Sequence, residues 1–294
     1  MIDILMPTIA QGLLWAIMAL GVYITFRVLD IADLTVEGSF PLGAAVAASV
    51  LSEGYSVAVA FICAAIAGML AGVATGLLHT KLKIPALLAG ILTMIALYSV
   101  NLRVMGKANL SLLRIDTIFT EMQAWFNLDN VYTVLSVGAI AAVLSGLFIY
   151  WFFGTEIGAA IRATGFNQQM IRAQGVDTRV TIILGLLISN ALVALSGALI
   201  AQNNGFADVG MGTGTIVIGL ASVIIGEVLF GTRSFKNCIV SVILGSVVYR
   251  IVIAAVLQMG MPPNDLKLFT ALLVAFALSL PLVKDKVGAR KAVK

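Results

Sequence analysis

Long apolar runs constrain this chain more than any other feature of its sequence. Runs such as Ile4–Phe26 and Val131–Phe153 are about as long as a bilayer core is thick, and short polar stretches separate them. Inside lipid every backbone polar group needs a partner within the protein, so such runs are predicted to be helices. Only 11% of the residues are charged, against roughly 25% in a typical soluble domain. The sequence therefore predicts an all-α, polytopic helical membrane protein with a single transmembrane domain over residues 1–294.

Two apolar elements are too short to cross a membrane upright, because a crossing needs about 20 residues. Ser39–Leu51 is rich in small residues and is expected to be buried among other helices, and Ile216–Phe230 is interrupted by glycines. The first follows Asp33 and the second follows Asp208. Paired short segments of this kind are typical of an internal repeat around a translocation path. We therefore expect about eight membrane elements, two of them short or broken, and an internal repeat.

A face of small residues runs along the predicted span Tyr55–His79. Gly68, Gly72 and Gly76 recur at four-residue intervals, and such a face lets two helix backbones approach closely. We expect these glycines to serve helix packing rather than transport chemistry.

The stretch Gly154–Thr178 is too polar to lie in lipid, although long apolar runs flank it on both sides. Its middle, Ile157–Arg172, is predicted to form a short helix that Gly165 interrupts and Gly175 ends. A short polar helix between two membrane spans is suited to dock into a soluble partner. Loops with some helix are also common in membrane proteins, so composition alone leaves both interpretations open.

Two motifs carry a resemblance to a known family. The first, G-x-A-I-R-A-x-G-x-N followed by A-x-x-x-G-[VI], spans Gly158–Val176, and the second is Asp33–Ser39 with Gly43 after it. They resemble the coupling segment and the D-L-S-V-G-S segment of ABC importer permeases of the branched-chain amino acid and ribose class. Glu37, which precedes the glycine here, departs from the second pattern. The resemblance covers nearly the whole chain, is strongest to tryptophan/tyrosine permeases of that class, and says little about the solute.

This resemblance implies that residues 154–178 form a cytoplasmic coupling segment. In the family this segment sits in a groove of a separate ATP-binding subunit, which holds ATP and Mg, so no cofactor is expected on this chain. Arg162 and Asn167 would be the polar contacts, although Arg162 could instead be a charge that only orients the chain in the membrane. The contacting residues implied are Ala160, Ile161, Arg162, Ala163, Thr164, Gly165, Phe166, Asn167 and Gln168.

The resemblance implies further partners outside the membrane and within it. These are an extracytoplasmic solute-binding protein and a second copy of the chain in a homodimer, with a pair of similar permease chains as the alternative. Nucleic acid is a poor explanation of the net charge of +4, because the basic residues fall at the ends of spans.

Motifs that would make this chain an enzyme are missing from its sequence. It has no G-x-x-x-x-G-K-[ST] phosphate loop, and His79 is its only histidine, which argues against a multi-histidine metal site. We therefore expect no catalysis and no metal on this chain, and ATP hydrolysis on a separate one.

Basic residues also predict the orientation, because cytoplasmic loops carry most of the Lys and Arg. If residues 154–178 are cytoplasmic, the opposite side holds only Arg103, Lys107, Arg114 and Lys267. The prediction is a multi-pass protein of the cell membrane, with its N-terminus outside and its C-terminus, which carries a basic tail, in the cytoplasm.

Polar residues inside spans are candidates for a translocation path, because polar groups in lipid are costly and often functional. They are Tyr98, Asn101, Asn190, Ser196 and Arg250. A hydrogen bond between helices is an equally good interpretation of each. The acidic residues lie near the ends of the predicted spans, which counts against an ion-coupled carrier.

Together these features favour the permease subunit of an ABC importer that moves a small solute inward by alternating access. The solute is expected to be an amino acid or a related molecule. The alternative is a secondary carrier or channel, which would transport without an ATPase and, as a carrier, would depend on an ion gradient.

Overall fold

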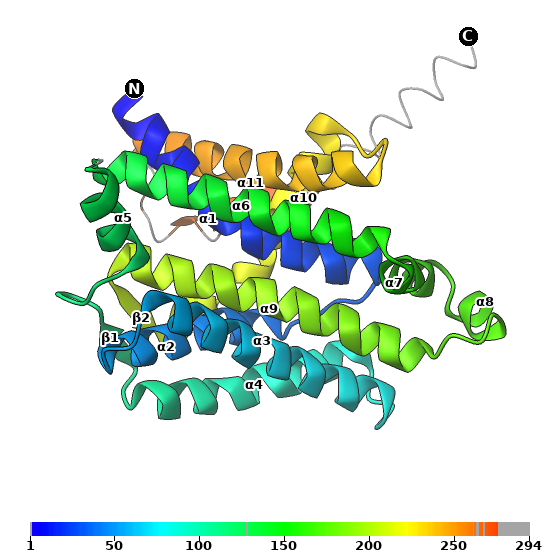
Figure 1. The fold of residues 1–294 in the computed structure, drawn as a ribbon. Coiled ribbons are helices and arrows are strands. Elements are labelled where there is room, and N and C mark those ends of the chain that lie inside the picture. Colours follow the sequence, from blue (N-terminus) through cyan, green and yellow to red (C-terminus); the bar gives the residue numbers. More distant parts are fainter. Residues whose placement is uncertain (1, 128, 261, 263–264, 267, 276–294) are drawn as a thin grey trace, which may run out of the picture.

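The chain forms a bundle of helices that run side by side between two ends (Figure 1). A computed structural model describes residues 2–127, 129–260, 262, 265–266 and 268–275. Seven of the described helical segments are long and apolar enough to cross a membrane, and a shorter apolar helix accompanies them. This confirms the predicted class of a polytopic helical membrane protein.

Helices make up almost all of the described elements, and two three-residue strands pair as an antiparallel ribbon with Asn109 opposite Asp208. In chain order the elements are α1 (Ile2–Tyr23), the π-helical η1 (Ile24–Val28), α2 (Val36–Ser52), α3 (Val57–Thr80), α4 (Ala86–Met105), β1 (Asn109–Ser111), α5 (Ile118–Phe126), α6 (Asn130–Gly154), α7 (Glu156–Phe166), α8 (Gln168–Ala173), α9 (Thr178–Asn204), β2 (Phe206–Asp208), the 3₁₀-helical η2 (Val209–Gly212), α10 (Thr215–Phe230) and α11 (Phe235–Gln258).

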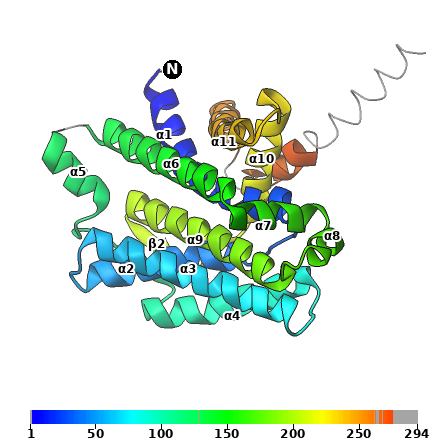
Figure 2. The ribbon, with the colours of Figure 1, turned by 45° about the vertical axis from the view of Figure 1, so that its right-hand side comes forward.

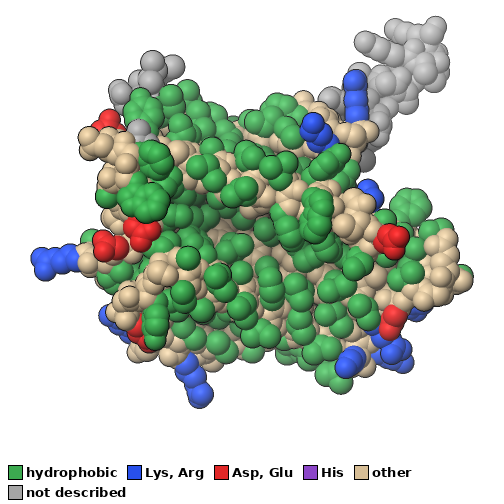
Figure 3. Space-filling view, viewed as in Figure 1, with side chains coloured by type: hydrophobic (Ala, Val, Ile, Leu, Met, Phe, Trp, Pro, Cys, Tyr) green, Lys and Arg blue, Asp and Glu red, His purple; other side chains and the backbone are tan. Residues whose placement is uncertain are grey.

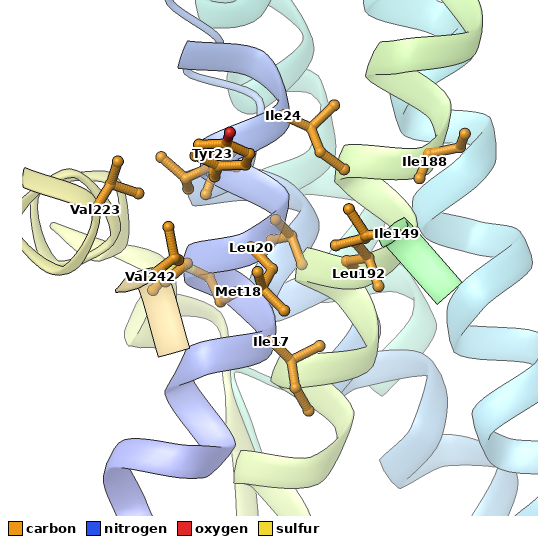
Figure 4. Packing of buried hydrophobic residues seen from close by; sticks show 14 of the residues in the cluster. Ile17, Met18, Leu20, Tyr23, Ile24, Ile149, Ile188, Leu192, Val223 and Val242 are labelled. Carbon is orange, nitrogen blue, oxygen red and sulfur yellow. The ribbon is translucent and has the colours of Figure 1, made fainter. Parts of the chain in front are cut away.

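The spans α1 and α9 form the centre of the bundle. Their apolar stretches are 72% and 78% buried, whereas the other spans are 28–39% buried. Helix α9 lies between α2, α3 and α4 on one side and α1 and α6 on the other (Figure 2). Figure 4 shows apolar side chains of α1, such as Ile17 and Leu20, among Leu192 of α9, Val223 of α10 and Val242 of α11. The largest cluster of buried apolar residues therefore joins α1, α6, α9, α10 and α11, and smaller clusters lie among α2–α4 and between α10 and α11.

Charged side chains gather at the two ends of the bundle, and apolar side chains cover the middle of the face drawn in Figure 3. Helices α7 and α8 lie at one end, while α5, β1 and β2 lie at the other (Figure 1). We call these the α7–α8 end and the α5–β1 end. An apolar band between two charged ends is the surface that a bilayer requires.

The two shorter apolar helices, α2 with 17 residues and α10 with 16, both begin in the interior of the bundle, and α10 reaches the length of a span only together with η2. Residues 29–35 fold back from the end of η1, so that Asp33 reaches Asn190 near the middle of α9. Gly214, directly before α10, donates its backbone N–H to Glu37 Oε1 in the first turn of α2, at 3.0 Å. The N-termini of α2 and α10 therefore meet, and we call this place the half-helix junction.

The glycine face of α3 packs against α9. A Cβ atom at Gly68 would overlap the backbone carbonyl of Asn190, and one at Gly72 would overlap that of Leu186. Gly76 also faces α9 and leaves no room for a side chain. The close approach of these two helices therefore depends on the absence of side chains at these positions.

The predicted interruption at Gly165 is wrong. Gly165 lies inside α7, and the break falls at Asn167, whose side chain caps α8 instead of continuing the first helix. Gly165 is glycine for another reason, because a Cβ there would overlap the carbonyl oxygen of Val28. Gly175 follows α8 with a φ of +86°, as predicted for a residue that ends a helix.

The predicted last span, Asp265–Val283, lies only partly within the described residues, which stop at residue 275. Lys267 and the basic tail lie outside them. The ribbon of β1 and β2 was not expected, because three-residue strands give no periodic signal in a sequence.

Candidate functional site

The α7–α8 segment is fixed to the bundle by caps and by one buried face. Thr155 Oγ1 accepts a hydrogen bond from the Gly158 N–H at 3.3 Å, which begins α7 directly after α6 ends. Ile161 and Thr164 are buried, and Thr164 Oγ1 lies 2.8 Å from Thr181 Oγ1 of α9. Of the residues that the family resemblance implies as contacts, these two face the bundle rather than a partner.

The opposite face of α7 is open to a partner. Phe166 is 91% exposed, and Arg162, Asn167 and Gln168 are exposed around it. The Arg162 guanidinium lies over the ring of Phe235 of α11, with 5.2 Å between its carbon and the ring centre. A large apolar side chain surrounded by accessible polar groups is suited to insert into the surface of another protein.

Helix α7 is also tied to the end of α1. Gly165 lies against the carbonyl of Val28, where η1 ends. Beside it, Arg27 Nε donates to both carboxylate oxygens of Glu227 in α10, at 2.9 and 3.0 Å. A cavity of about 400 Å³ lies between these residues and the exposed face of α7. A displacement of α7 would therefore reach the end of α1 directly, and α10 through the Arg27–Glu227 pair.

Tyr98 and Asn101 come together at a second cavity, of about 440 Å³, at the half-helix junction. Glu37 lines the same cavity, which we call the junction cavity. Asn101 is fully buried, and its Nδ2 donates to the carbonyl of Gly38 at 3.3 Å. Its Oδ1 accepts no hydrogen bond from a described residue. Tyr98, which also lines the cavity, is 56% exposed.

A buried polar network holds the start of α2. Asp33, which is 2% exposed, accepts from Asn190 Nδ2 at 2.8 Å and from the Thr35 N–H at 2.9 Å. The prediction that acidic residues lie near span ends is therefore wrong for Asp33 and Glu37. Residues 29–35 fold back so that Asp33 lies inside the bundle and Glu37 lies in the first turn of α2, and this fold-back gives no pattern in the sequence.

The other candidates for a path do not line the junction cavity. Asn190 belongs to the network with Asp33, and Ser196 Oγ donates to the carbonyl of Leu14 at 2.9 Å. Asn190 and Ser196 therefore both make hydrogen bonds to another segment of the chain, which was the alternative interpretation of each residue. The Arg250 guanidinium lies 4.2 Å from the ring centre of Trp15, and its Nε has no hydrogen-bond partner among the described residues.

In the sequence, Glu37 stands out only as a departure from the D-L-S-V-G-S pattern. A signal was present, because an acidic residue in the first turn of a short, buried element is costly and needs a reason. Within the described part of the chain, no group of three or more His, Cys, Asp and Glu side chains could hold a metal ion.

Comparison with known proteins gives consistent results. The family described as "Branched-chain amino acid transport system / permease component" matches residues 4–278. The tyrosine transport system permease protein of Clostridioides difficile (strain R20291) is 42% identical over 270 residues, which cover 92% of this chain and 88% of that protein. The galactofuranose transporter permease protein of Escherichia coli (strain K12) is 27% identical over 90% of this chain and 75% of its own length.

A solved ABC transporter in an inward-facing conformation has a similar fold, with a TM-score of 0.52. The match covers 96% of this chain and 85% of the other at 14% sequence identity, and it therefore concerns the fold alone.

Proposed function

Because the chain belongs to the family of branched-chain amino acid transport system permease components, we propose that it is the membrane permease subunit of an ABC importer. Its own spans carry the solute, and a separate ATP-binding subunit holds ATP and Mg and supplies the energy. The chain works as a homodimer that alternates between outward-facing and inward-facing states.

The observation that carries this proposal is the exposed face of α7. A helix that buries one face in its own bundle and leaves Phe166 91% exposed on the other presents a surface for a partner. Arg162, Asn167 and Gln168 surround Phe166 with polar groups that can bond to that partner. A nucleotide-driven ATPase that binds there can move α7 as one unit.

The route from α7 to the solute passes through the end of α1. Gly165 contacts the carbonyl of Val28, and residues 29–35 run from there to Asp33, whose bonds to Asn190 and Thr35 hold the start of α2. We infer that a shift of α7 is passed along this non-helical segment to the half-helix junction, and that ATP hydrolysis on the partner subunit acts on the junction cavity by this route.

The proposed solute is an amino acid, and tyrosine is the first to test because of the relative that is 42% identical. A solute-binding protein would deliver it at the α5–β1 end. That assignment follows from the basic residues, which put the α7–α8 end in the cytoplasm, the N-terminus outside and the C-terminus inside.

A secondary carrier is the second candidate, and the buried Asp33 is the observation that favours it. Carboxylates inside membranes often bind protons or ions during transport. Against this function, both carboxylate oxygens of Asp33 accept hydrogen bonds within the chain, which suits a structural role.

The first experiment is to purify the tagged chain in mild detergent from its native membrane and identify what accompanies it by mass spectrometry. An ATP-binding subunit at about one copy per permease chain is the expected result. A chain that purifies alone and catalyses uptake into liposomes without ATP would be a secondary carrier, and the proposal would fail.

The orientation has a separate test. Photo-reactive groups placed in residues 106–127 should cross-link the solute-binding protein, whereas groups placed in α8 should not. Cross-links that form only from α8 would reverse the proposed topology.

A further inference from the structure

We propose that the junction cavity recognises the protonated amino group of the solute, with Glu37 and Asn101 as its acceptors. This inference rests on the proposed transport function and assigns the group that selects the solute.

The position of the cavity suits a solute site. It lies where α2 and α10 begin inside the bundle, and helices that begin within the membrane commonly border the substrate in membrane transporters. A volume of about 440 Å³ lies within the range of small-molecule sites. Met94, Ile95 and Tyr98 of α4 give it an apolar wall, which could hold the side chain of an amino acid.

The polar wall of the cavity has hydrogen-bond acceptors that no described donor satisfies. Glu37 Oε1 takes the N–H of Gly214, but Oε2 accepts no hydrogen bond from the residues that the structure describes. Glu37 also makes no ion pair within the described part of the chain, where Arg27 pairs with Glu227 instead. A carboxylate in the interior of a membrane protein is costly unless a cation or donors satisfy it.

Asn101 supplies the second, independent observation. Its side chain is fully buried, its Nδ2 is used by Gly38, and its Oδ1 is left without a donor among the described residues. Buried acceptors without a partner are rare in folded proteins. An ammonium group carries three donors and one positive charge and no acceptor, so it matches a free carboxylate oxygen and a free amide oxygen on one wall.

A purely structural role is the competing explanation, because a glutamate beside the N-terminus of α10 also stabilises that helix. This role explains why Glu37 Oε1 accepts the Gly214 N–H. It does not explain the free Oδ1 of Asn101 or the cavity that both residues line.

The test measures binding to the purified permease–ATPase complex without the solute-binding protein, so that the selectivity of that protein does not contribute. The probes are L-tyrosine, tyramine, which keeps the amine but lacks the carboxylate, and 3-(4-hydroxyphenyl)propanoate, which lacks the amine. The wild-type complex should bind both amines and should bind the propanoate at least tenfold more weakly, because a charge-assisted bond is lost.

Two variants and one control complete the design. Glu37→Gln should weaken binding of both amines about ten- to hundredfold and leave the propanoate almost unchanged. Asn101→Leu should weaken the amines about two- to tenfold, because it removes a neutral acceptor. Glu53→Gln makes the same chemical change at the exposed far end of α2 and should not alter binding.

Three results would overturn the inference. They are amine binding by Glu37→Gln at the wild-type level, equal binding of tyrosine and the propanoate, and a complex that contains its ATPase yet binds neither amine. All three leave the permease function in place, because that proposal fails only if the chain purifies without an ATPase and transports without ATP.

Discussion

The middle of the bundle and the α7–α8 end both gather polar side chains, but they use them in opposite ways. In the middle, Asp33, Thr35 and Asn190 are at most 2% exposed, and each is hydrogen-bonded within the chain. At the α7–α8 end, Phe166 is 91% exposed, and Arg162 is exposed although its guanidinium rests on the ring of Phe235. Polar groups in the first region fix the fold, and the exposed groups in the second are the ones that we propose contact another protein. Substitutions in the two regions should therefore separate stability from coupling.

The largest effect on stability is expected from Gly72→Leu in α3. Even a Cβ at this position overlaps the carbonyl of Leu186, and a leucine would force α3 away from α9, the most buried span. Overpacking typically costs about 1–3 kcal/mol, and a clash with backbone should reach or exceed the upper end. The yield of monodisperse protein and its melting temperature in detergent measure this.

Gly154→Leu is the matched control for this substitution, because no atom lies within 4 Å of a Cβ built there. It should express and melt like the parent. If Gly72→Leu also did so, the glycine face of α3 would look toward lipid, and the packing of α3 on α9 would be incorrect.

A smaller loss is expected from Asp33→Ala, which removes the acceptor of both Asn190 Nδ2 and the Thr35 N–H. Leaving buried donors unpaired should cost about 1–3 kcal/mol of unfolding free energy. Asp33→Asn should cost less, because its oxygen can still accept from Thr35. Unfolding titrations in mixed micelles measure both variants.

Asp116→Ala serves as the control for Asp33, since Asp116 is exposed at the α5–β1 end. The two substitutions should differ clearly in stability. Equal stability of Asp33→Ala and Asp116→Ala would mean that the network does not hold α2, and the contrast between the two regions would lose its basis.

Arg27→Gln should have a small effect, although it breaks the described ion pair with Glu227. The Arg27 side chain is 49% exposed and that of Glu227 only 10%, so solvent reaches the pair from the Arg27 side, and the loss should stay at about 1 kcal/mol. The exchange Arg27→Glu with Glu227→Arg should recover whatever is lost. If Arg27→Gln instead lowered the free energy of unfolding by several kcal/mol, this ion pair would stabilise the fold as the buried network does.

The same contrast explains what could be predicted from the sequence. Apolar length predicted the spans, and glycine spacing predicted the packing face of α3, because both signals are local and periodic. The path of residues 29–35 could not be predicted, because a fold-back is decided by contacts with α9 far along the chain. The sequence therefore placed Asp33 and Glu37 near the ends of spans, whereas they lie deeper in the bundle. It did not predict the junction cavity, although Tyr98 and Asn101 were among the candidate path residues.

The smallest effect on stability, and the largest on transport, is expected from Arg162→Glu. Arg162 lies on the exposed face of α7 and rests on the ring of Phe235, so reversal of its charge removes one weak contact and no buried bond. The variant should melt like the parent. It should nevertheless lose most ATP-driven uptake in liposomes while the ATPase continues to turn over, because the docking surface now carries the opposite charge.

Lys81→Glu makes the same change of charge at the same end of the bundle, beyond α3 and away from α7. It should leave uptake per ATP hydrolysed close to that of the parent. Unchanged uptake with Arg162→Glu would remove Arg162 from the coupling surface. Equal losses from both variants would show that the overall charge of this end matters, rather than the exposed face of α7. If only Arg162→Glu loses uptake, and its melting temperature is unchanged, the exposed face of α7 serves coupling and does not stabilise the fold.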